Sequence, residues 1–164
     1  MYRNKVRIAE RGETLSDGEY FLVVHICVFN RKNQMLIQKR QPFKKGWAGL
    51  WDISAGGAAQ SGESSSQAAN RELNEEIGID YDFSAKRPYV SVSYTAGFDD
   101  YYIVELEVNP DELILQYEEV EQVRWADKYE ILSMIDNGEF IPYHKGFIEM
   151  LFDMRNDFGT INDY

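Results

Sequence analysis

The sequence predicts an α/β/α sandwich, in which a mixed β-sheet carries helices on both faces. Two runs of apolar and β-branched residues, 20–30 and 34–40, predict a strand pair near the start of the chain. Residues 65–77 and 143–156 have the apolar spacing of helices, and further strands are expected between them. Because strands and helices are interspersed in this way, helices are expected to cover both faces of one sheet.

The composition fits one globular domain. The chain has 164 residues, of which 44% are hydrophobic and 14% aromatic, and this is enough for one well-buried core and too little for two. We therefore expect a single domain over residues 1–164, in which residues 1–19 are a polar lead-in of undetermined structure. The one cysteine, Cys27, lies in the most apolar run, so we expect a buried structural thiol and no internal disulfide.

Turns separate the expected strands of each pair. The first two are joined by a polar turn at 30–33, which connects two β-rich runs. Residues 88–95 and 101–108 predict a second strand pair across a turn at 96–100. A further short strand is expected at 120–125.

The helices have recognisable ends or faces. For the helix at 65–77, Ser64 and Gln67 have the spacing of a capping box, and Gly78 suits the left-handed residue that ends a helix. The apolar side of this helix is predicted to contain Ala68, Ala69, Leu73 and Ile77. Two later helices are expected, one at 127–136 and a closing one at 143–156, whose inward side chains are Phe147, Ile148, Leu151 and Phe152.

One face of the helix at 65–77 is acidic. Successive helical residues turn by about 100°, so Glu72, Glu75 and Glu76 fall within roughly a third of the circumference. Like charges at these spacings destabilise an isolated helix by about 0.2–0.5 kcal/mol per pair. A hard divalent cation compensates such a face, and carboxylate oxygens suit Mg²⁺, with Mn²⁺ as the alternative. The competing interpretation is the solvated surface of a glutamate-rich helix.

The glutamates belong to a longer pattern. From Gly57 the chain runs through five residues to Glu63, and after seven more it reads Arg71-Glu72-Leu73-Asn74-Glu75-Glu76-Ile77-Gly78-Ile79. This run fills every fixed position of the Nudix box, so the chain resembles the Nudix hydrolases, with the box at 57–79. The resemblance implies a Nudix α/β/α sandwich in which the box forms a loop-helix-loop. It also implies Mg²⁺-dependent cleavage of a diphosphate linked to another moiety.

The resemblance assigns roles within the box. The expected metal ligands are Glu72, Glu75, Glu76 and Gly57. Glu75 or Glu76 is the candidate that orients or deprotonates the attacking water, which a metal bridging carboxylates and phosphate oxygens would acidify. In the family the box arginine, here Arg71, locks Glu63 and orients the catalytic carboxylates. The spacing alone would allow Arg71 to pair with Glu75 instead.

Outside the box, the chain is most similar to the isopentenyl-diphosphate isomerase-like branch of the superfamily. The similarity runs from about residue 20 to Trp125 and includes Lys44-Lys45-Gly46-Trp47, Gly49-Leu50-Trp51 and Gln60-Ser61-Gly62-Glu63. Isomerases carry Cys-Gly-His-Pro where this chain has Gly56-Gly57-Ala58-Ala59, whose side chains neither transfer a proton nor bind a cation. We therefore predict a hydrolase. An isopentenyl-diphosphate isomerase and a non-catalytic diphosphate-binding module remain the alternatives.

A basic cluster at 39–45 precedes the box. Arg40 and Lys44 are predicted to clamp the diphosphate, because a planar guanidinium suits phosphate oxygens, and a solvated loop is the competing interpretation. Candidates for an additional ligand or base outside the box are Asp99, Asp100, Glu118, Glu119 and Glu121. Aromatic candidates for stacking on a substrate are Trp47, Trp51, Tyr94 and Phe98, with core packing as the default use, and Trp125 is assigned to the core.

The two histidines are expected to have different environments. His25 lies in the most apolar predicted strand, so it is interpreted as a hydrogen-bonded core or pocket residue rather than a metal ligand. His144 begins the last helix and is interpreted as surface.

The net charge restricts the class of partner. A formal charge of −11 argues against polymeric nucleic acid, which requires a basic face. The sequence shows neither a signal pattern nor the run of roughly 18–20 apolar residues that spans a membrane, so a cytoplasmic protein without a membrane partner is expected. The expected partner is a small-molecule diphosphate, and dimers among relatives suggest a homodimer. Nucleoside triphosphates, nucleotide sugars, dinucleotides, thiamine diphosphate and isoprenoid diphosphates all remain candidate substrates.

Overall fold

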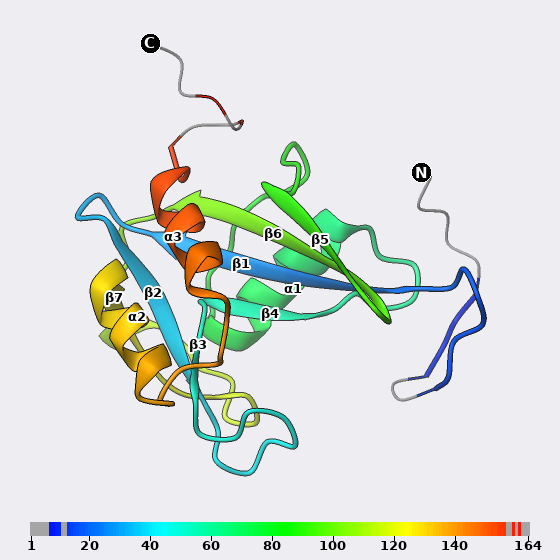
Figure 1. The fold of residues 1–164 in the computed structure, drawn as a ribbon, viewed down its shortest axis with the longest axis horizontal. Coiled ribbons are helices and arrows are strands. Elements are labelled where there is room, and N and C mark those ends of the chain that lie inside the picture. Colours follow the sequence, from blue (N-terminus) through cyan, green and yellow to red (C-terminus); the bar gives the residue numbers. More distant parts are fainter. Residues whose placement is uncertain (1–6, 11–12, 157–158, 160, 162–164) are drawn as a thin grey trace.

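The computed structural model describes residues 7–10, 13–156, 159 and 161. Its first two strands, β1 (Phe21–Phe29) and β2 (Gln34–Arg40), are antiparallel and meet where Phe29 faces Met35. The turn between them contains Asn33 at a φ of 61°, a conformation that asparagine tolerates well. Beyond this end the two strands diverge, and each finds other partners (Figure 1).

The divergence divides the sheet into two arms. On one arm, β1 pairs in parallel with β6 (Gly97–Glu105) and antiparallel with β4 (Ala55–Ala58), while β5 (Val90–Tyr94) extends the sheet beyond β6. On the other arm, β2 pairs antiparallel with β3 (Trp51–Asp52) and β7 (Val120–Asp127). Within the described residues, seven strands therefore form one mixed sheet.

Helices cover both faces of the sheet. Helix α1 (Ser65–Ile77) lies on one face, and α2 (Lys128–Asp136) and α3 (Lys145–Asp153) lie on the other (Figure 1). Alternate residues of β1 serve the two cores, since side chains of successive strand residues point to opposite faces. The α1 core contains Val24, Ile26, Val28, Ala68, Ala69, Leu73 and Ile77. The α3 core contains Cys27, Phe29, Ile131, Met134, Ile148, Leu151 and Phe152. The predicted α/β/α sandwich is confirmed.

Several element boundaries differ from those predicted. The turn before β6 is shorter than expected, so Asp99 and Asp100 lie within the strand, where β1 provides a parallel partner along its whole length. The last helix is shorter than the predicted 143–156. Asp127, expected to open α2, ends β7 and caps α2 by accepting a hydrogen bond from the Glu130 amide at 2.9 Å.

Three short elements were not predicted. These are β3, β4 and the 3₁₀ turn η1 (Pro110–Glu112). Strand β4 reads Ala-Gly-Gly-Ala, a composition with low strand propensity, and it forms because its backbone pairs with β1 over the whole of its length.

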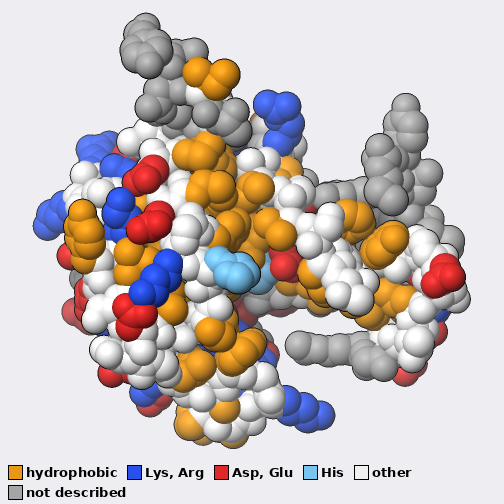
Figure 2. Space-filling model, viewed as in Figure 1, with side chains coloured by type: hydrophobic (Ala, Val, Ile, Leu, Met, Phe, Trp, Pro, Cys, Tyr) orange, Lys and Arg blue, Asp and Glu red, His pale blue; other side chains and the backbone are white. Residues whose placement is uncertain are grey.

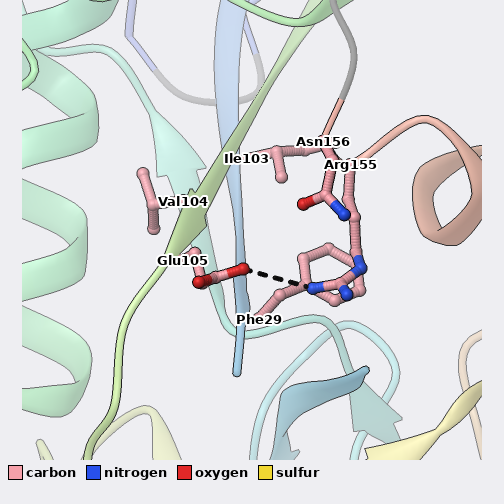
Figure 3. Close-up of a pocket in the computed structure, with 6 residues that line it drawn as sticks. All are labelled: Phe29, Ile103, Val104, Glu105, Arg155 and Asn156. Carbon is pink, nitrogen blue, oxygen red and sulfur yellow. Dashed lines mark hydrogen bonds and ion pairs between the residues drawn. The ribbon is translucent and has the colours of Figure 1, made fainter. Parts of the chain in front are cut away.

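The described ends of the chain have local contacts. Arg7 in the lead-in lies 2.7 Å from Glu19 and 2.8 Å from Glu13, and part of the lead-in falls outside the described residues. After α3, Arg155 donates to the Asn30 carbonyl at 3.2 Å and lies 3.5 Å from Glu105. Figure 3 shows the small hollow at this position, which is lined by Phe29, Ile103, Val104, Glu105, Arg155 and Asn156. None of the helices in the described ranges has the length and apolar character that crossing a membrane requires.

The end of α1 gives a stability prediction. Gly78 has a φ of 70°, and a Cβ built there would lie 3.0 Å from the Ile114 side chain and carbonyl oxygen. Gly78→Ala should lower the free energy of unfolding by about 2–5 kcal/mol, the sum of the left-handed backbone term and overpacking. Chemical denaturation measures this loss.

Gly138→Ala is the matched control for Gly78→Ala. Gly138 has a φ of 72°, and a Cβ built there has nothing within 4 Å. It should therefore lose only the backbone term, about 1–2 kcal/mol. Equal losses for the two variants would show that the contact with Ile114 contributes nothing.

Candidate metal and diphosphate site

The box helix begins and ends as its sequence predicts. The Ser64 side chain accepts a hydrogen bond from the Gln67 amide, and the Gln67 side chain accepts one from the Ser64 amide, which completes a capping box. At the other end, the Gly78 amide donates to the Asn74 carbonyl at 2.9 Å. These caps fix the register of α1 and hence the direction of each glutamate.

Glu76 is the most buried of the box glutamates, with 3% of its surface exposed. One of its oxygens, Oε2, accepts hydrogen bonds from the Gly56 amide and from the Gln38 side chain, both at 3.0 Å. Burial raises the pKa of Glu76 to about 8; the charges of Glu72 and Asp52 act in the same direction, and the hydrogen bonds from the Gly56 amide and Gln38 oppose the rise. Both recorded donors are neutral, so a cation nearby would stabilise the ionised form of this buried carboxyl group.

Glu72 lies against the backbone of β4. A Cβ built on Gly57 would fall 2.3 Å from Glu72 Oε1 and 2.5 Å from its Cδ, so the carboxylate occupies the space that a side chain would take. Burial raises the pKa of Glu72, while the bond from Arg71 opposes that shift. Gly57 thus leaves room for the close approach of a charged group, and its φ is not positive.

Arg71 joins the loop side of the box to the helix side. Its Nε and Nη2 donate to the two oxygens of Glu63 at 2.8 and 3.0 Å, and its Nη2 also reaches the Ala58 carbonyl at 3.1 Å. Its Nη1 donates to Glu72 at 2.8 Å and to Glu75 at 3.0 Å. These bonds, first of all the one to Glu63, raise the pKa of Arg71. The two pairings considered from the sequence, Arg71 with Glu63 and Arg71 with Glu75, therefore occur together.

The basic cluster borders the same region. Arg40, at the end of β2, donates to the Gly46 carbonyl at 3.2 Å and lies 3.4 Å from Asp52 Oδ2. Lys44 forms an ion pair with Glu119. The charge of Glu119 is among the causes that raise the pKa of Glu72, so the partner of Lys44 lies close enough to act on the acidic face.

The other acidic candidates have separate environments. Asp99 lies 3.4 Å from His25, and Glu121 lies 2.9 Å from Lys39. Asp100 is 1% exposed and accepts hydrogen bonds from Ser65 and Ser91, which makes it part of the interior. Of the five candidates outside the box, Glu119 is the one that the structure brings to the box glutamates through a recorded interaction.

The aromatic candidates are divided between surface and interior. Trp47 is 55% exposed and Tyr94 39% exposed, whereas Trp51 packs under the Arg124 guanidinium at 4.7 Å. Phe98 packs edge-on against Tyr20, with their ring centroids 5.2 Å apart. Trp125 packs against the α1 core and donates its indole N–H to the Val108 carbonyl at 3.3 Å.

Two site residues were not identified from the sequence. Gln38 follows the apolar run of β2 and is 2% exposed. Its buried side chain donates a hydrogen bond to Glu76. Asp52 is 8% exposed and accepts from the Tyr143 hydroxyl at 2.9 Å while facing Arg40. A polar residue within a buried strand is the signal that could have indicated each of them.

The carboxylates suit a divalent cation in chemistry, although their side chains lie apart. As they stand, no three His, Cys, Asp or Glu side chains in the described ranges are grouped so that they could hold a metal ion. Arg71 holds Glu72 and Glu75 instead, and Glu76 turns inward. The fit to a metal therefore rests on the oxygen donor set and on Glu76, a buried carboxyl group whose ionised form a cation would stabilise.

The fold and the box define a Nudix domain, and comparison with known proteins agrees. Residues 19–148 match the family model of the NUDIX domain, so the chain belongs to the Nudix family. It is an enzyme of the Nudix hydrolase class. An uncharacterized Nudix hydrolase of Listeria innocua is 49% identical over 146 residues, which cover 89% of this chain and 85% of that protein.

Other similarities extend into the isomerase branch and into solved structures. The isopentenyl-diphosphate Delta-isomerase of Escherichia coli is 35% identical over 117 residues, covering 66% of this chain and 63% of the isomerase. The crystal structure of DR0079 from Deinococcus radiodurans superposes with a TM-score of 0.66 at 24% identity, covering 92% of this chain and 97% of that one. The MutT protein of Methanosarcina mazei gives 0.63 at 24% identity, covering 87% and 99%. These structures support the fold.

Gly57→Ala tests the packing of Glu72 against β4. The added methyl group overlaps a flexible carboxylate rather than backbone, so the stability should change by less than about 1 kcal/mol. The displaced carboxylate should weaken divalent-metal affinity by about 10- to 100-fold. Titration calorimetry with Mg²⁺ and chemical denaturation give the two readouts. Gly146→Ala, where a Cβ meets nothing within 4 Å, is the control. Unchanged metal affinity in Gly57→Ala would contradict the assignment of Glu72.

The raised pKa of Glu76 predicts how metal-free stability depends on pH. The pKa is about 8 in the folded protein against an ordinary value of 4.5, so the folded state retains a proton that the unfolded chain releases. The resulting stability is fully present below about pH 4.5 and is lost as the pH rises through about 8.

Glu76→Gln should remove that loss of stability, because a neutral amide oxygen can still accept from Gly56 and Gln38. Thermal unfolding of both proteins between about pH 5 and about pH 8.5, with a chelator present, measures the difference. Parallel pH profiles for wild type and variant would show that Glu76 is already ionised in the folded state.

Proposed function

We propose that this protein is a Mg²⁺-dependent hydrolase that cleaves the diphosphate bond of a small organic diphosphate. The observation that carries the proposal is the complete set of box glutamates. Glu72 packs against Gly57, Arg71 holds Glu63, Glu72 and Glu75, and Glu76 is buried against the Gly56 amide. Mn²⁺ is the alternative cation, since the same oxygen donors suit it. The substrate is a small molecule, because a net charge of −11 opposes binding to a polymeric nucleic acid.

The expected metal ligands are Glu72, Glu75, Glu76 and the backbone of Gly57. When bound there with substrate, Mg²⁺ neutralises phosphate charge and lowers the pKa of a coordinated water. Arg71 keeps Glu63 and the helix carboxylates in fixed relative positions through its five recorded hydrogen bonds. Glu75 is the most exposed of the three, at 48% of its side chain, and it is suited to orient or deprotonate the water.

Two cations at the border of the site are suited to hold the diphosphate. Arg40 is positioned by Gly46 and Asp52, so its guanidinium is oriented before substrate binds. Lys44 exchanges its bond to Glu119 for one to a phosphate oxygen, which releases the Glu119 carboxylate beside Glu72. Glu119 then becomes available as an additional ligand or base from outside the box.

The isomerase alternative is favoured by one comparison and opposed by the site. The Escherichia coli isomerase is 35% identical over 117 residues, yet the positions that match the isomerase Cys and His are Gly56 and Ala58. Glycine and alanine have no group that can protonate or deprotonate carbon. Hydrolysis of a diphosphate bond is therefore the reaction that the residues of this site support.

A substrate panel tests the proposal. The protein is incubated with Mg²⁺ and each of the nucleoside triphosphates, nucleotide sugars, diadenosine polyphosphates, thiamine diphosphate and isopentenyl diphosphate, and released phosphate, pyrophosphate or phosphomonoester is assayed. We expect metal-dependent release from at least one compound. Glu75→Gln should lower kcat by about 10²- to 10⁴-fold, because it removes the group that activates water.

The metal-free melting temperature of Glu75→Gln should stay near that of wild type, since its pairing with Arg71 is a partly exposed salt bridge. Glu130→Gln, a similarly exposed salt-bridge variant on α2, should leave kcat unchanged. Migration of the isopentenyl double bond without phosphate release would overturn the hydrolase assignment. A large drop in metal-free stability would make Glu75 structural.

A further inference from the structure

Asp52 lies between the basic cluster and the connection from α2 to α3. Its strand, β3, is only two residues long, and it is held from both sides. On one side it pairs with β2. On the other side the Trp51 amide donates to the Glu139 carbonyl, and the Ile141 amide donates to the Trp51 carbonyl, both at 2.9 Å. The connection therefore runs alongside β3 (Figure 1), and the backbone of Asp52 is fixed between two segments.

The two carboxylate oxygens of Asp52 have different partners. Oδ1 accepts hydrogen bonds from the Ile53 amide at 2.8 Å and from the Tyr143 hydroxyl at 2.9 Å. Oδ2 lies 3.4 Å from Arg40 Nη1. The two short bonds set the orientation of the carboxylate, and that orientation directs its second oxygen toward the guanidinium.

The guanidinium of Arg40 is held along one edge. Its Nε donates to the Gly46 carbonyl at 3.2 Å, and its Nη1 faces Asp52. Among the residues that the structure describes, Nη2 has no recorded acceptor, and no buried side-chain nitrogen or oxygen lacks a partner, so Nη2 is open to solvent. Arg40 thus keeps donors for a ligand, and phosphate oxygens bind such donors in pairs.

A carboxylate beside Arg40 can act in two opposite ways. As a competitor, it repels an anionic ligand and occupies a donor. As an organiser, it holds a long side chain whose ordering would otherwise weaken binding. The contact of 3.4 Å is longer than the roughly 2.7–2.9 Å of a strong charge-assisted bond, so it occupies the donor only weakly. The side chains of Arg40 and Asp52 are 17% and 11% exposed, which restricts where the guanidinium can move. The geometry favours the organiser.

Asp52 also lies close to the Nudix box. It is in register with Gln38 of β2, whose side chain donates to Glu76 at 3.0 Å. The charge of Asp52 is among the causes that raise the pKa of Glu76. Asp52 is therefore within electrostatic reach of the box, and so is a guanidinium held beside it.

We propose that Tyr143 and Asp52 are positioning residues that hold Arg40 ready for the diphosphate. Neither side chain contacts the substrate, and both act through the guanidinium. A hydroxyl on the connection before α3 thereby contributes to the binding of a ligand at the box. This inference rests on the proposed function, since it concerns how the same site holds the diphosphate.

The test measures binding of methylenediphosphonate, a diphosphate analogue that cannot be hydrolysed, by calorimetry at saturating Mg²⁺. Asp52→Asn keeps an oxygen that accepts from Ile53 and Tyr143 and removes the charge that faces Arg40. It should weaken binding by about 3- to 10-fold, because the arginine must then be ordered when the ligand binds. A competitor would give the opposite result, since removal of a negative charge favours an anion. Tighter binding, or an unchanged affinity, would overturn the inference.

A double variant separates positioning from a structural role. In an Arg40→Ala background, Asp52→Asn should not weaken diphosphonate binding further, because the side chain through which it acts is absent. Equal losses with and without Arg40 would show a general distortion of the site and overturn the inference.

Tyr143→Phe tests the hydroxyl. The variant removes the bond that orients Asp52 and keeps the ring beside Phe147, with which it stacks at 6.5 Å between centroids. It should weaken diphosphonate binding in the same direction as Asp52→Asn and by a smaller factor, because the Ile53 amide still holds the carboxylate. An unchanged affinity would overturn the role assigned to Tyr143.

Asp153→Asn is the control for loss of an aspartate ion pair. Acidic and basic side chains lie interspersed on the face of the molecule that carries α2 and α3 (Figure 2). Between these helices Asp153 lies 3.0 Å from Lys128, and 65% of its side chain is exposed. Because exposed charges are screened, this variant should leave diphosphonate affinity within about twofold.

Kinetics give a second readout with any compound that the substrate panel shows to be hydrolysed. Asp52→Asn should raise KM by about the same factor and leave kcat within about threefold, because Arg40 acts in binding. If no compound is hydrolysed, the proposed function fails, whereas the diphosphonate titration still decides the role of Asp52. A wild-type protein that does not bind the diphosphonate would overturn both.

Discussion

The position of the whole box depends on one buried carboxylate that joins the two arms of the sheet. Glu76 reaches from α1 to the Gly56 amide on the β1 arm and to Gln38 on the β2 arm. Those arms separate after Phe29 and Met35, so without a bridging acceptor the Gly56 amide and the Gln38 amide would be left buried and unpaired at the divergence. The carboxyl group accepts from both, and because it is only 3% exposed its ionised form is disfavoured and its pKa is raised. The structure thus buries, where the sheet opens, a carboxyl group whose ionised form a cation would stabilise.

Arg71 compensates the negative charge of the other acidic side chains of the box, which are more exposed than Glu76. Its guanidinium lies among Glu63, Glu72 and Glu75, so three carboxylates that would repel one another are held by one rigid fork of donors. A lysine in this position could not reach the two oxygens of Glu63 and two other carboxylates in a fixed plane. The arginine therefore sets the geometry of the acidic face. The burial of Glu76 is the reason why a cation would stabilise the ionised form of that residue.

Local sequence predicted the parts of this arrangement that local interactions determine. The bounds of α1 were predicted because Ser64, Gln67 and Gly78 form caps within the helix itself, and the sandwich followed from the order of strands and helices. Strand β4 was not predicted, because Ala-Gly-Gly-Ala becomes a strand through pairing with a segment some thirty positions earlier in the chain. Gln38 and Asp52 were missed for the same reason. Their partners Glu76 and Tyr143 are distant in sequence, so their polar character within a buried strand was the one available signal.

This chain differs from the isomerases in its packing as well as in its chemistry. The glycines at 56 and 57 lack the isomerase cysteine side chain, and they also allow close contacts that a larger residue would prevent. A Cβ on Gly56 would fall 2.7 Å from the Val24 carbonyl, so a cysteine there requires the backbones of β1 and β4 to move apart. A Cβ on Gly57 would displace Glu72. The tight pairing that positions Glu72 and Glu76 is therefore incompatible with a cysteine at 56 on the same backbone. The pairing of β4 with β1 leaves no room for a side chain at Gly56, and its approach to α1 leaves none at Gly57 unless Glu72 moves, so the packing of β4 accommodates the box glutamates and not the isomerase cysteine.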